Sequence, residues 1–234
     1  MDRSTPGAVI LDVDGTMYRQ GPVRLGMMLR LAAYAVGQPR EGTACLVALR
    51  AYRRAQERLR ADPAALEHQG IDQVGLASRM TGLDESTIRR HVERWMERVP
   101  LDLVARAVRP GLEEFLVAAR RRGTRIGVYS DYRAEAKLLA LGVRRLIDVV
   151  RSAQDDGGNR FKPNPAGLLL VASELGVAPE STVYVGDRVD VDAVAARRAG
   201  MRAYMLKSRA PSGSEDWISI DGFSELTGMW YPDH

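Results

Sequence analysis

The sequence predicts an α/β protein with a doubly wound parallel sheet, interrupted after its first strand by an inserted all-helical segment. Three observations favour this architecture. Residues 8–11 form a short apolar run, residues 22–103 contain no strand pattern, and short apolar runs alternate with helical stretches from residue 109 onward. Strands that alternate with helices of about ten residues indicate a parallel sheet with helices on both faces.

Boundary residues mark the first strand and the helices that follow it. The apolar run Ala8–Leu11 ends at Asp12, which is typical of a buried strand. Pro22 suits a first helical position and Gly37 suits a helix end. Asp84 can cap a later helix. The helices expected in this segment cover residues 23–36, 43–60 and 84–99.

The rest of the chain alternates between strands and helices, and glycines end the helices. The expected strands cover residues 125–129, 146–150, 182–185, 203–206 and 217–220, and the expected helices cover residues 112–122, 134–141, 164–175 and 192–199. We therefore expect a Rossmann-like core domain made of residues 1–15 and 106–234, with an inserted helical domain made of residues 16–105.

The composition is that of an ordinary globular protein. The 234 residues are 45% hydrophobic and 27% charged. No apolar stretch approaches the ~20 residues that a membrane span requires, so no membrane partner is expected. The first residues do not have the pattern of a secretory signal. The single cysteine, Cys45, excludes an internal disulfide, and we expect a cytoplasmic protein.

The net charge of +4 is concentrated in the inserted segment. Residues 16–105 contain 14 arginines and no lysine against 10 acidic residues. This excess fits a segment that meets anions, and it fits a solvated arginine-rich helix surface equally well. Nucleic acid is not expected as a partner, because only 6% of the residues are aromatic and no basic run is interleaved with them.

Residues that carry chemistry follow the predicted strands, at the edge where open parallel sheets bind ligands. Carboxylates follow the first and fourth strands, and a serine follows the second. A lysine lies between the third and fourth strands, where the proline after it favours an extended conformation. The candidate residues, in chain order, are Asp12, Asp14, Ser130, Lys162, Asp187, Asp190 and Asp192.

Carboxylates that converge on one sheet edge repel each other unless a cation joins them. Mg²⁺ is the favoured cation, because it needs few protein ligands and keeps water or substrate phosphate oxygens in its shell. Lys162 adds a fixed positive charge. The candidate set therefore supplies the groups that phosphoryl transfer needs: a carboxylate nucleophile, a second carboxyl group for acid–base catalysis, a hydroxyl donor and two cations.

Four short motifs together resemble the haloacid dehalogenase superfamily of phosphohydrolases, in the branch with a helical cap inserted after the first strand. The motifs are Ala8–Thr16, Ser130, Lys162-Pro163 and Val185–Asp192, and they occur in the expected order at the expected strand ends. The resemblance covers the whole predicted core. It implies a Mg²⁺-dependent phosphatase that acts on a small phosphorylated substrate.

The resemblance also implies a role for each matching residue. Asp12 attacks the phosphorus and forms an aspartyl-phosphate, and Asp14 protonates the leaving oxygen and then activates water. Ser130 and Lys162 bind the phosphoryl group. The metal ligands implied are Asp12, the backbone carbonyl of Asp14, and Asp187, with Asp192 in support. Asp190 competes with Asp192 for the last role, and the helix-start position favours Asp192.

Two branches of the superfamily fit the sequence poorly. Dehalogenases need no acid two residues after the nucleophile, whereas this chain has Asp14. The phosphonate-cleaving branch uses a cap lysine, and residues 16–105 contain none. A sugar phosphomutase and a non-catalytic phosphate-binding regulatory protein stay open as alternatives. The sequence leaves open whether the protein is a monomer or a homodimer.

Overall fold

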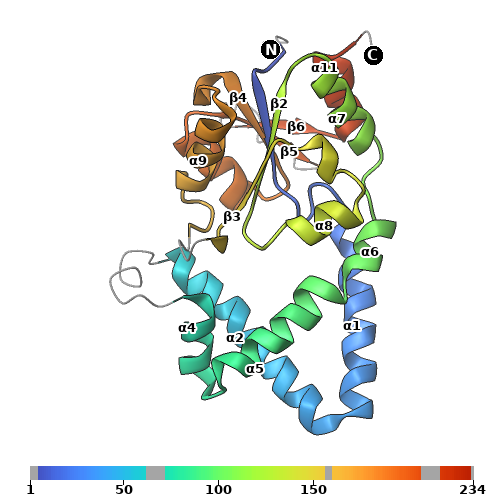
Figure 1. The fold of residues 1–234 in the computed structure, drawn as a ribbon, viewed down its shortest axis with the longest axis vertical. Coiled ribbons are helices and arrows are strands. Elements are labelled where there is room, and N and C mark those ends of the chain that lie inside the picture. The colour runs from blue at the N-terminus through green and yellow to red at the C-terminus, as the bar shows by residue number, and fades with distance from the viewer. Residues whose placement is uncertain (1–4, 62–71, 156–159, 207–216, 233–234) are drawn as a thin grey trace.

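The computed structural model describes residues 5–61, 72–155, 160–206 and 217–232. Its centre is a six-stranded parallel sheet with the strand order β3-β2-β1-β4-β5-β6 (Figure 1). The strands are β1 (Ala8–Leu11), β2 (Arg125–Ser130), β3 (Val149–Ser152), β4 (Thr182–Gly186), β5 (Arg202–Leu206) and β6 (Ile218–Ile220). The predicted α/β class with a parallel, Rossmann-like sheet is therefore confirmed.

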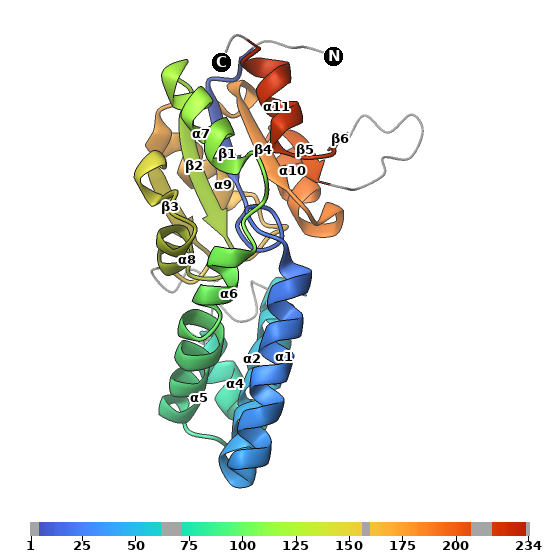
Figure 2. The same cartoon turned by 90° about the vertical axis from the view of Figure 1, so that its right-hand side faces the viewer.

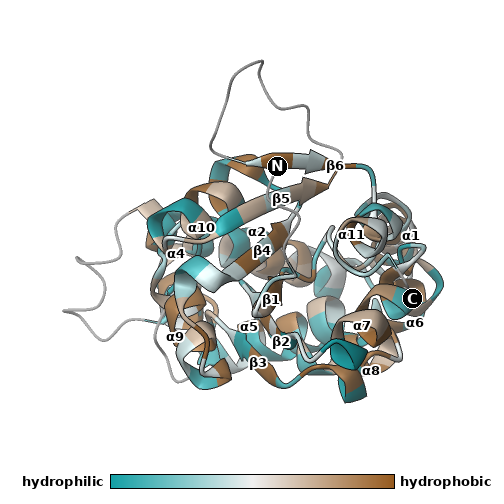
Figure 3. Ribbon diagram, turned by 90° about the horizontal axis from the view of Figure 1, so that it is seen from above, coloured by the Kyte–Doolittle hydropathy of each residue, from teal (hydrophilic) through white to brown (hydrophobic). Residues whose placement is uncertain are grey.

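β1 lies in the middle of the sheet, and all four of its residues are fully buried. Helices cover both faces (Figure 3). On one face lie α9 (Ala166–Leu175) and α10 (Val194–Arg198), and on the other lie α7 (Leu112–Arg121), α8 (Glu135–Ala140) and α11 (Phe223–Trp230). Because both faces are covered, a central strand is apolar at every position, and this is the pattern of residues 8–11.

Between β1 and α7, the regular elements of the described residues are all helices. They are α1 (Gln20–Gly37), α2 (Pro39–Ala61), α4 (Gln73–Thr81), α5 (Glu85–Val92) and α6 (Leu101–Arg106), with a π-helical turn (Glu93–Arg98) after α5. Figures 1 and 2 show these helices grouped at one end of the sheet, where β1 leads into α1. We call Gln20–Arg106 the helical segment. Its packed interior includes Cys45, Tyr52 and Trp95.

The two connections between the sheet and the helical segment run side by side. Tyr18 and Val108 form an antiparallel bridge. The Arg19 N–H donates to the Ala107 carbonyl at 2.8 Å, and the Arg109 N–H donates to the Met17 carbonyl at 2.9 Å. The outgoing and returning chains are thus fixed to each other beside the end of β1.

Several element boundaries differ from the sequence prediction. The third strand begins at Val149 rather than 146, because Arg144–Leu146 forms a short 3₁₀ helix. Asp192 does not begin a helix but lies within a π-helical turn, Val189–Ala193, that precedes α10. The helix α11 was not predicted. It packs its buried Phe223 and Leu226 against the sheet.

The helix starts in the helical segment also differ in detail. α1 begins at Gln20, so Pro22 is its third residue rather than its first. Asp84 precedes α5, but its side chain makes no capping hydrogen bond. Within the described ranges, no helix combines the length and the apolar character needed to cross a bilayer.

Candidate active site

Asp12 and Lys162 form a buried ion pair at the end of β1. The Lys162 ammonium lies 2.6 Å from Asp12 Oδ1 and 2.6 Å from Asp192 Oδ1. Asp12 is 4% exposed and Lys162 is 2% exposed. Burial raises the pKa of Asp12 well above its usual range, and Lys162 opposes that rise. Burial alone would lower the pKa of Lys162, but Asp12 and Asp192 raise it, so the ammonium stays charged.

Asp192 fixes the loop that follows β4. Its Oδ2 accepts hydrogen bonds from the backbone N–H groups of Asp187 (3.2 Å) and Arg188 (3.0 Å), and its Oδ1 accepts one from the Tyr184 hydroxyl (3.1 Å). Asp190 is exposed and pairs with Arg188 at 2.6 Å. Of the two alternatives from the sequence, the structure brings Asp192, and not Asp190, to Asp12.

Asp187 has an oxygen that lacks a hydrogen-bond partner. Its Oδ1 is buried and accepts no hydrogen bond from the residues that the structure describes. Burial and the nearby Asp192 carboxylate raise the pKa of Asp187 to about 6, against the lowering effect of Lys162. Gly15 makes room for this carboxylate: it has φ +102°, and a Cβ built there would lie 2.1 Å from Asp187 Oδ2. Only glycine allows both the backbone conformation and the close approach.

This donor set fits a divalent cation. Carboxylate oxygens of Asp12, Asp187 and Asp192 lie within 4.8 Å of one another. Repulsion among these carboxylates contributes to the raised pKa values of Asp12 and Asp187. A cation bound among them would relieve that repulsion. Hard oxygen donors and a carboxylate oxygen without a hydrogen-bond partner favour an ion such as Mg²⁺.

Asp14 is held by two residues. The Lys137 ammonium lies 2.6 Å from both carboxylate oxygens, and the Tyr18 hydroxyl donates to Oδ1. Burial by itself would raise the pKa of Asp14, but Lys137 and Tyr18 lower it below its usual value. These contacts therefore favour the carboxylate form of Asp14.

Lys137 is a site residue that the sequence analysis missed. It lies on α8 and is only 7% exposed. Its position in the sequence could have indicated burial. Residues 134, 137, 138 and 141 follow the helical i, i+3, i+4, i+7 spacing, and all four are buried in the structure. A lysine on that apolar face needs a buried partner, and the partner is Asp14.

Ser130 and Arg109 complete the site. Ser130 ends β2, is 1% exposed, and its hydroxyl oxygen accepts a hydrogen bond from the Tyr132 N–H at 3.3 Å. The Arg109 guanidinium donates to the Gly15 carbonyl from Nη2 (2.5 Å) and Nε (3.1 Å). The Asp12–Thr16 loop is thus fixed by the chain that returns from the helical segment.

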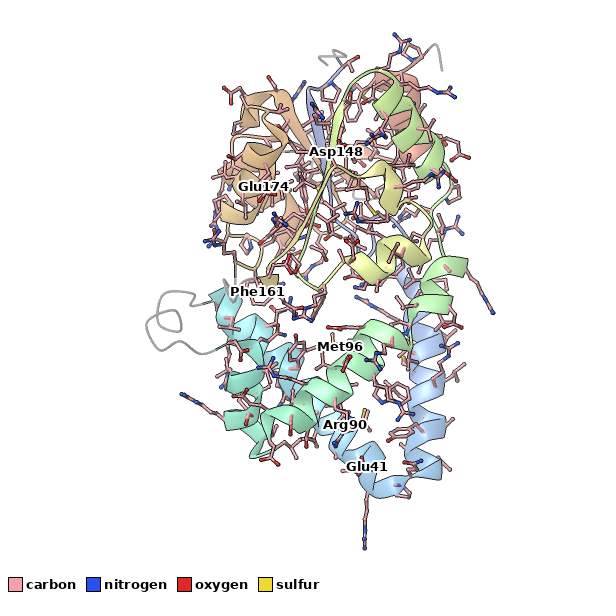
Figure 4. The ribbon with its side chains drawn as sticks, in the orientation of Figure 1. Glu41, Arg90, Met96, Asp148, Phe161 and Glu174 are labelled. Atoms are coloured by element: carbon pink, nitrogen blue, oxygen red, sulfur yellow. The ribbon has the colours of Figure 1, made fainter. Side chains whose placement is uncertain are left out.

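A cavity of about 760 Å³ lies between the sheet edge and the helical segment. Asp12, Asp14, Ser130, Lys162 and Asp187 line its core side. α1, α2 and the turn after α5 line the other side. In Figure 4, Met96, which lines the cavity, lies where the helical segment faces the core, whereas Glu41 and Arg90 lie at the far end.

Polar contacts connect α2 to the core on one side of this cavity. Arg60 pairs with Asp131 at 2.6 Å, and the Tyr132 hydroxyl donates to Gln56 Oε1. Asp131 in turn accepts a hydrogen bond from the Lys162 N–H at 3.1 Å. The position of α2 is therefore coupled to the loop that carries Lys162.

The structure thus combines a parallel, Rossmann-like sheet with a cluster of carboxylate and ammonium groups at the carboxyl ends of its strands. The sequence profile of the haloacid dehalogenase-like hydrolases matches residues 6–200, and the chain belongs to this family. The resemblance inferred from the four motifs is thereby confirmed.

Individual proteins agree with this assignment. The YhcW protein of Bacillus subtilis is 34% identical over 116 residues, which cover 48% of this chain and 51% of that protein. A phosphoglycolate phosphatase of Rhodospirillum rubrum is 28% identical over 238 residues, covering 96% of this chain and 90% of that protein. For YhcW and for other curated relatives, by contrast, the chain spans only about half of the relative's length.

The fold is also found in solved structures. The 2-haloacid dehalogenase from Pseudomonas syringae pv. Tomato DC3000 superposes with a TM-score of 0.66 at 22% identity, covering 96% of this chain and 97% of that chain. At this identity the likeness establishes the shared fold. The choice of reaction rests on the residues of the site.

Proposed function

We propose that the protein is a Mg²⁺-dependent phosphatase that hydrolyses a small phosphorylated metabolite through an aspartyl-phosphate on Asp12. The observation that carries the proposal is the convergence of Asp12, Asp187 and Asp192 within 4.8 Å, with the Lys162 ammonium 2.6 Å from two of them. The phosphatase named among the full-length relatives supports the same reaction class. In this proposal the helical segment is a cap domain with boundaries near residues 16 and 105.

The first step uses Asp12 as the nucleophile. A carboxylate oxygen of Asp12 forms a bond to phosphorus while the bond between phosphorus and the ester oxygen breaks. Lys162 and the Ser130 hydroxyl bind the non-bridging oxygens, whose charge is spread in the transition state. Asp12, Asp187 and the Asp14 carbonyl would hold Mg²⁺, which would supply additional positive charge to those oxygens when bound.

Asp14 moves the protons in both steps. In the first step its carboxyl group gives a proton to the departing ester oxygen. In the second it takes a proton from a water molecule that attacks the phosphorus of the aspartyl-phosphate, which releases inorganic phosphate and restores the Asp12 carboxylate. Lys137 and Tyr18 favour the form that accepts the proton. The negative charge of a bound phosphate raises the pKa of Asp14 for the first step.

The dehalogenase reaction is not proposed, although a dehalogenase shares the fold. A halide leaves without a proton, so that reaction gives no task to Asp14. Here Asp14 is instead positioned by two separate hydrogen-bonding partners. An ester oxygen, unlike a halide, needs a proton when it leaves, and Asp14 is positioned to supply it.

The test is release of inorganic phosphate from p-nitrophenyl phosphate and from a panel of phosphorylated metabolites. We expect turnover with Mg²⁺ and its loss in EDTA, with recovery when Mg²⁺ is added back. Equal turnover with and without EDTA, or no turnover of any compound in the presence of Mg²⁺, would contradict the proposal.

A further inference from the structure

The cavity contains more positive charge from arginine than its own carboxylates neutralise. Arg60 pairs with Glu57 and Asp131, and Arg188 pairs with Asp190. Four further arginines line the cavity, and across the described ranges none of them has a carboxylate within 4.0 Å. These four are Arg24, Arg53, Arg54 and Arg58. The charges of two of them, Arg24 and Arg53, act on tyrosines that contact Asp14 or Lys137.

Arg24 approaches Asp14 from α1. It lies on the face of the helix that carries Gln20, Met27 and Leu31, all of which line the cavity. Burial and Asp14 raise the pKa of the Tyr18 hydroxyl, and the positive charge of Arg24 opposes that rise. Tyr18 donates directly to Asp14, so the charge of Arg24 acts on a residue that contacts the proposed acid.

Arg53 lines the cavity from α2. It shares a helix face with Gln56 and Arg60, at spacings of three and seven residues, and both of these contact the loop after β2. Burial raises the pKa of Tyr132 in that loop, and the charge of Arg53 opposes it. The Tyr132 ring lies 5.6 Å from the Lys137 ammonium that holds Asp14. Arg24 and Arg53 thus line the cavity from two different helices, and the charge of each acts on a tyrosine that contacts Asp14 or Lys137.

The cavity wall beyond these two arginines is largely apolar. On α1 it continues over the next two turns with Met27 and Leu31, and on other elements it includes Leu49, Trp95 and Met96. A ligand with a hydrocarbon skeleton can pack against such a wall, whereas a ligand rich in hydroxyl groups finds few hydrogen-bond partners there.

Given the proposed function, the leaving group must occupy this space, since Asp14 protonates its oxygen. We propose that the leaving group of the substrate carries a second anionic group, a carboxylate or a phosphate, which Arg24 and Arg53 bind, on a short carbon body that packs against the apolar wall. A guanidinium without a carboxylate partner offers paired N–H donors that match either anion.

Three phosphomonoesters of equal carbon length test this substrate class: n-propyl phosphate, 3-(phosphonooxy)propanoate and propane-1,3-diyl bisphosphate. The readout is kcat/KM for phosphate release at fixed ionic strength. We expect at least one of the two compounds with a second anion to exceed n-propyl phosphate by about tenfold or more, the usual value of a hydrogen bond to a charged group. The arm that shows the excess identifies the anion as carboxylate or phosphate.

Matched variants assign that preference to the arginines. Arg24→Gln and Arg53→Gln should each lower the ratio of kcat/KM between the preferred anion and n-propyl phosphate by about tenfold or more. Arg50→Gln removes the same charge from the same helix at an exposed position outside the cavity, and should leave the ratio unchanged. Equal turnover of all three compounds by the wild type, or an equal change of the ratio in Arg50→Gln, would overturn the inference.

A binding measurement separates this inference from the proposed function. Calorimetry with the Asp12→Asn variant and Mg²⁺ measures the affinity for the same three compounds without turnover. Tighter binding of a compound with a second anion, together with its loss when Arg53→Gln is added, supports the anion site. This holds even if the wild type hydrolyses none of the three compounds, because the absence of hydrolysis refutes only the proposed phosphatase activity. Indistinguishable affinities for all three compounds refute the anion site even if hydrolysis is fast.

Discussion

The basic side chains around the cavity have different surroundings in the core and in the helical segment. In the core, Lys137 and Lys162 are less than 8% exposed, and each lies 2.6 Å from carboxylate oxygens. On the helical segment, Arg24 and Arg53 are exposed and have no carboxylate partner among the described residues. Lys137 and Lys162 of the core therefore have charged partners before any ligand binds, whereas Arg24 and Arg53 of the helical segment offer charges that a ligand can pair.

Under the proposed function, we expect the core charges to act in the chemical step and the arginines of the helical segment to act in substrate selection. Fixed, buried charges are suited to a transition state, because they need no reorganisation when charge develops. Exposed guanidiniums on helices suit recognition, since the binding partner supplies the missing charge. Substitutions in the two regions should accordingly change different quantities.

The largest effect is expected from Asp12→Asn. An amide cannot form the acyl-phosphate bond, so kcat for p-nitrophenyl phosphate should fall by about 10⁴-fold or more. Circular dichroism checks that the fold is kept. Near-wild-type turnover in a folded, sequence-verified sample would show that Asp12 is not the nucleophile.

Lys162→Met tests the claim that core charges are fixed by pairing. The substitution leaves Asp12 and Asp192 buried without their shared ammonium, and such a loss costs about 3–5 kcal/mol of unfolding free energy. Arg53→Gln, which breaks no ion pair in the described structure, should stay within about 0.5 kcal/mol of the wild type. Urea unfolding measures both, and similar losses in the two variants would remove the contrast between the regions.

Lys137→Met should have a smaller effect, concentrated in kcat. Asp14 keeps its contact with Tyr18 but loses the ammonium that holds both of its oxygens. We expect kcat to fall by about tenfold to a hundredfold, within the range that general acid–base catalysis contributes. Arg133→Met, at an exposed position near the start of the same helix, is the matched control. A change in KM alone would mean that Lys137 contacts substrate instead of positioning Asp14.

The smallest effect is expected from Arg60→Gln, at the contact between the two regions. The variant loses the 2.6 Å ion pair with Asp131 and should loosen α2 against the loop that carries Lys162. We expect KM for p-nitrophenyl phosphate to rise by about twofold to tenfold. Arg89→Gln, which breaks only exposed pairs on the helical segment, should leave KM unchanged. A fall in Mg²⁺ affinity in Arg60→Gln would instead place its effect at the cation site.

The sequence was sufficient for the sheet and for the residues at the ends of its strands. Strands buried on both faces are continuous apolar runs, so Ala8–Leu11 was recognisable without any tertiary information. The carboxyl ends of parallel strands share one edge. For this reason Asp12, Ser130 and Asp187 could be expected near one another.

Contacts that depend on helix packing were harder to predict. Lys137 and Asp14 are 123 residues apart, and their pairing depends on how α8 packs beside β1. π-helical turns have no distinct sequence signal. The change to π-helix at Glu93–Arg98 was therefore not anticipated within the predicted helix 84–99, and the predicted helix start at residue 192 falls inside the turn Val189–Ala193. The arginine excess of residues 16–105 was visible, but only the structure shows which arginines line the cavity.

The central claim is that one divalent cation is held by acidic residues from both ends of the chain, and its most direct test is the affinity for Mg²⁺. Calorimetric titration would compare the wild type with Asp187→Asn and with Asp190→Asn, which differ by three positions in one loop. We predict that Asp187→Asn weakens Mg²⁺ binding by about tenfold or more and that Asp190→Asn, whose carboxylate faces Arg188, binds as the wild type does. Unchanged affinity in Asp187→Asn, or equal losses in the two variants, would contradict the account.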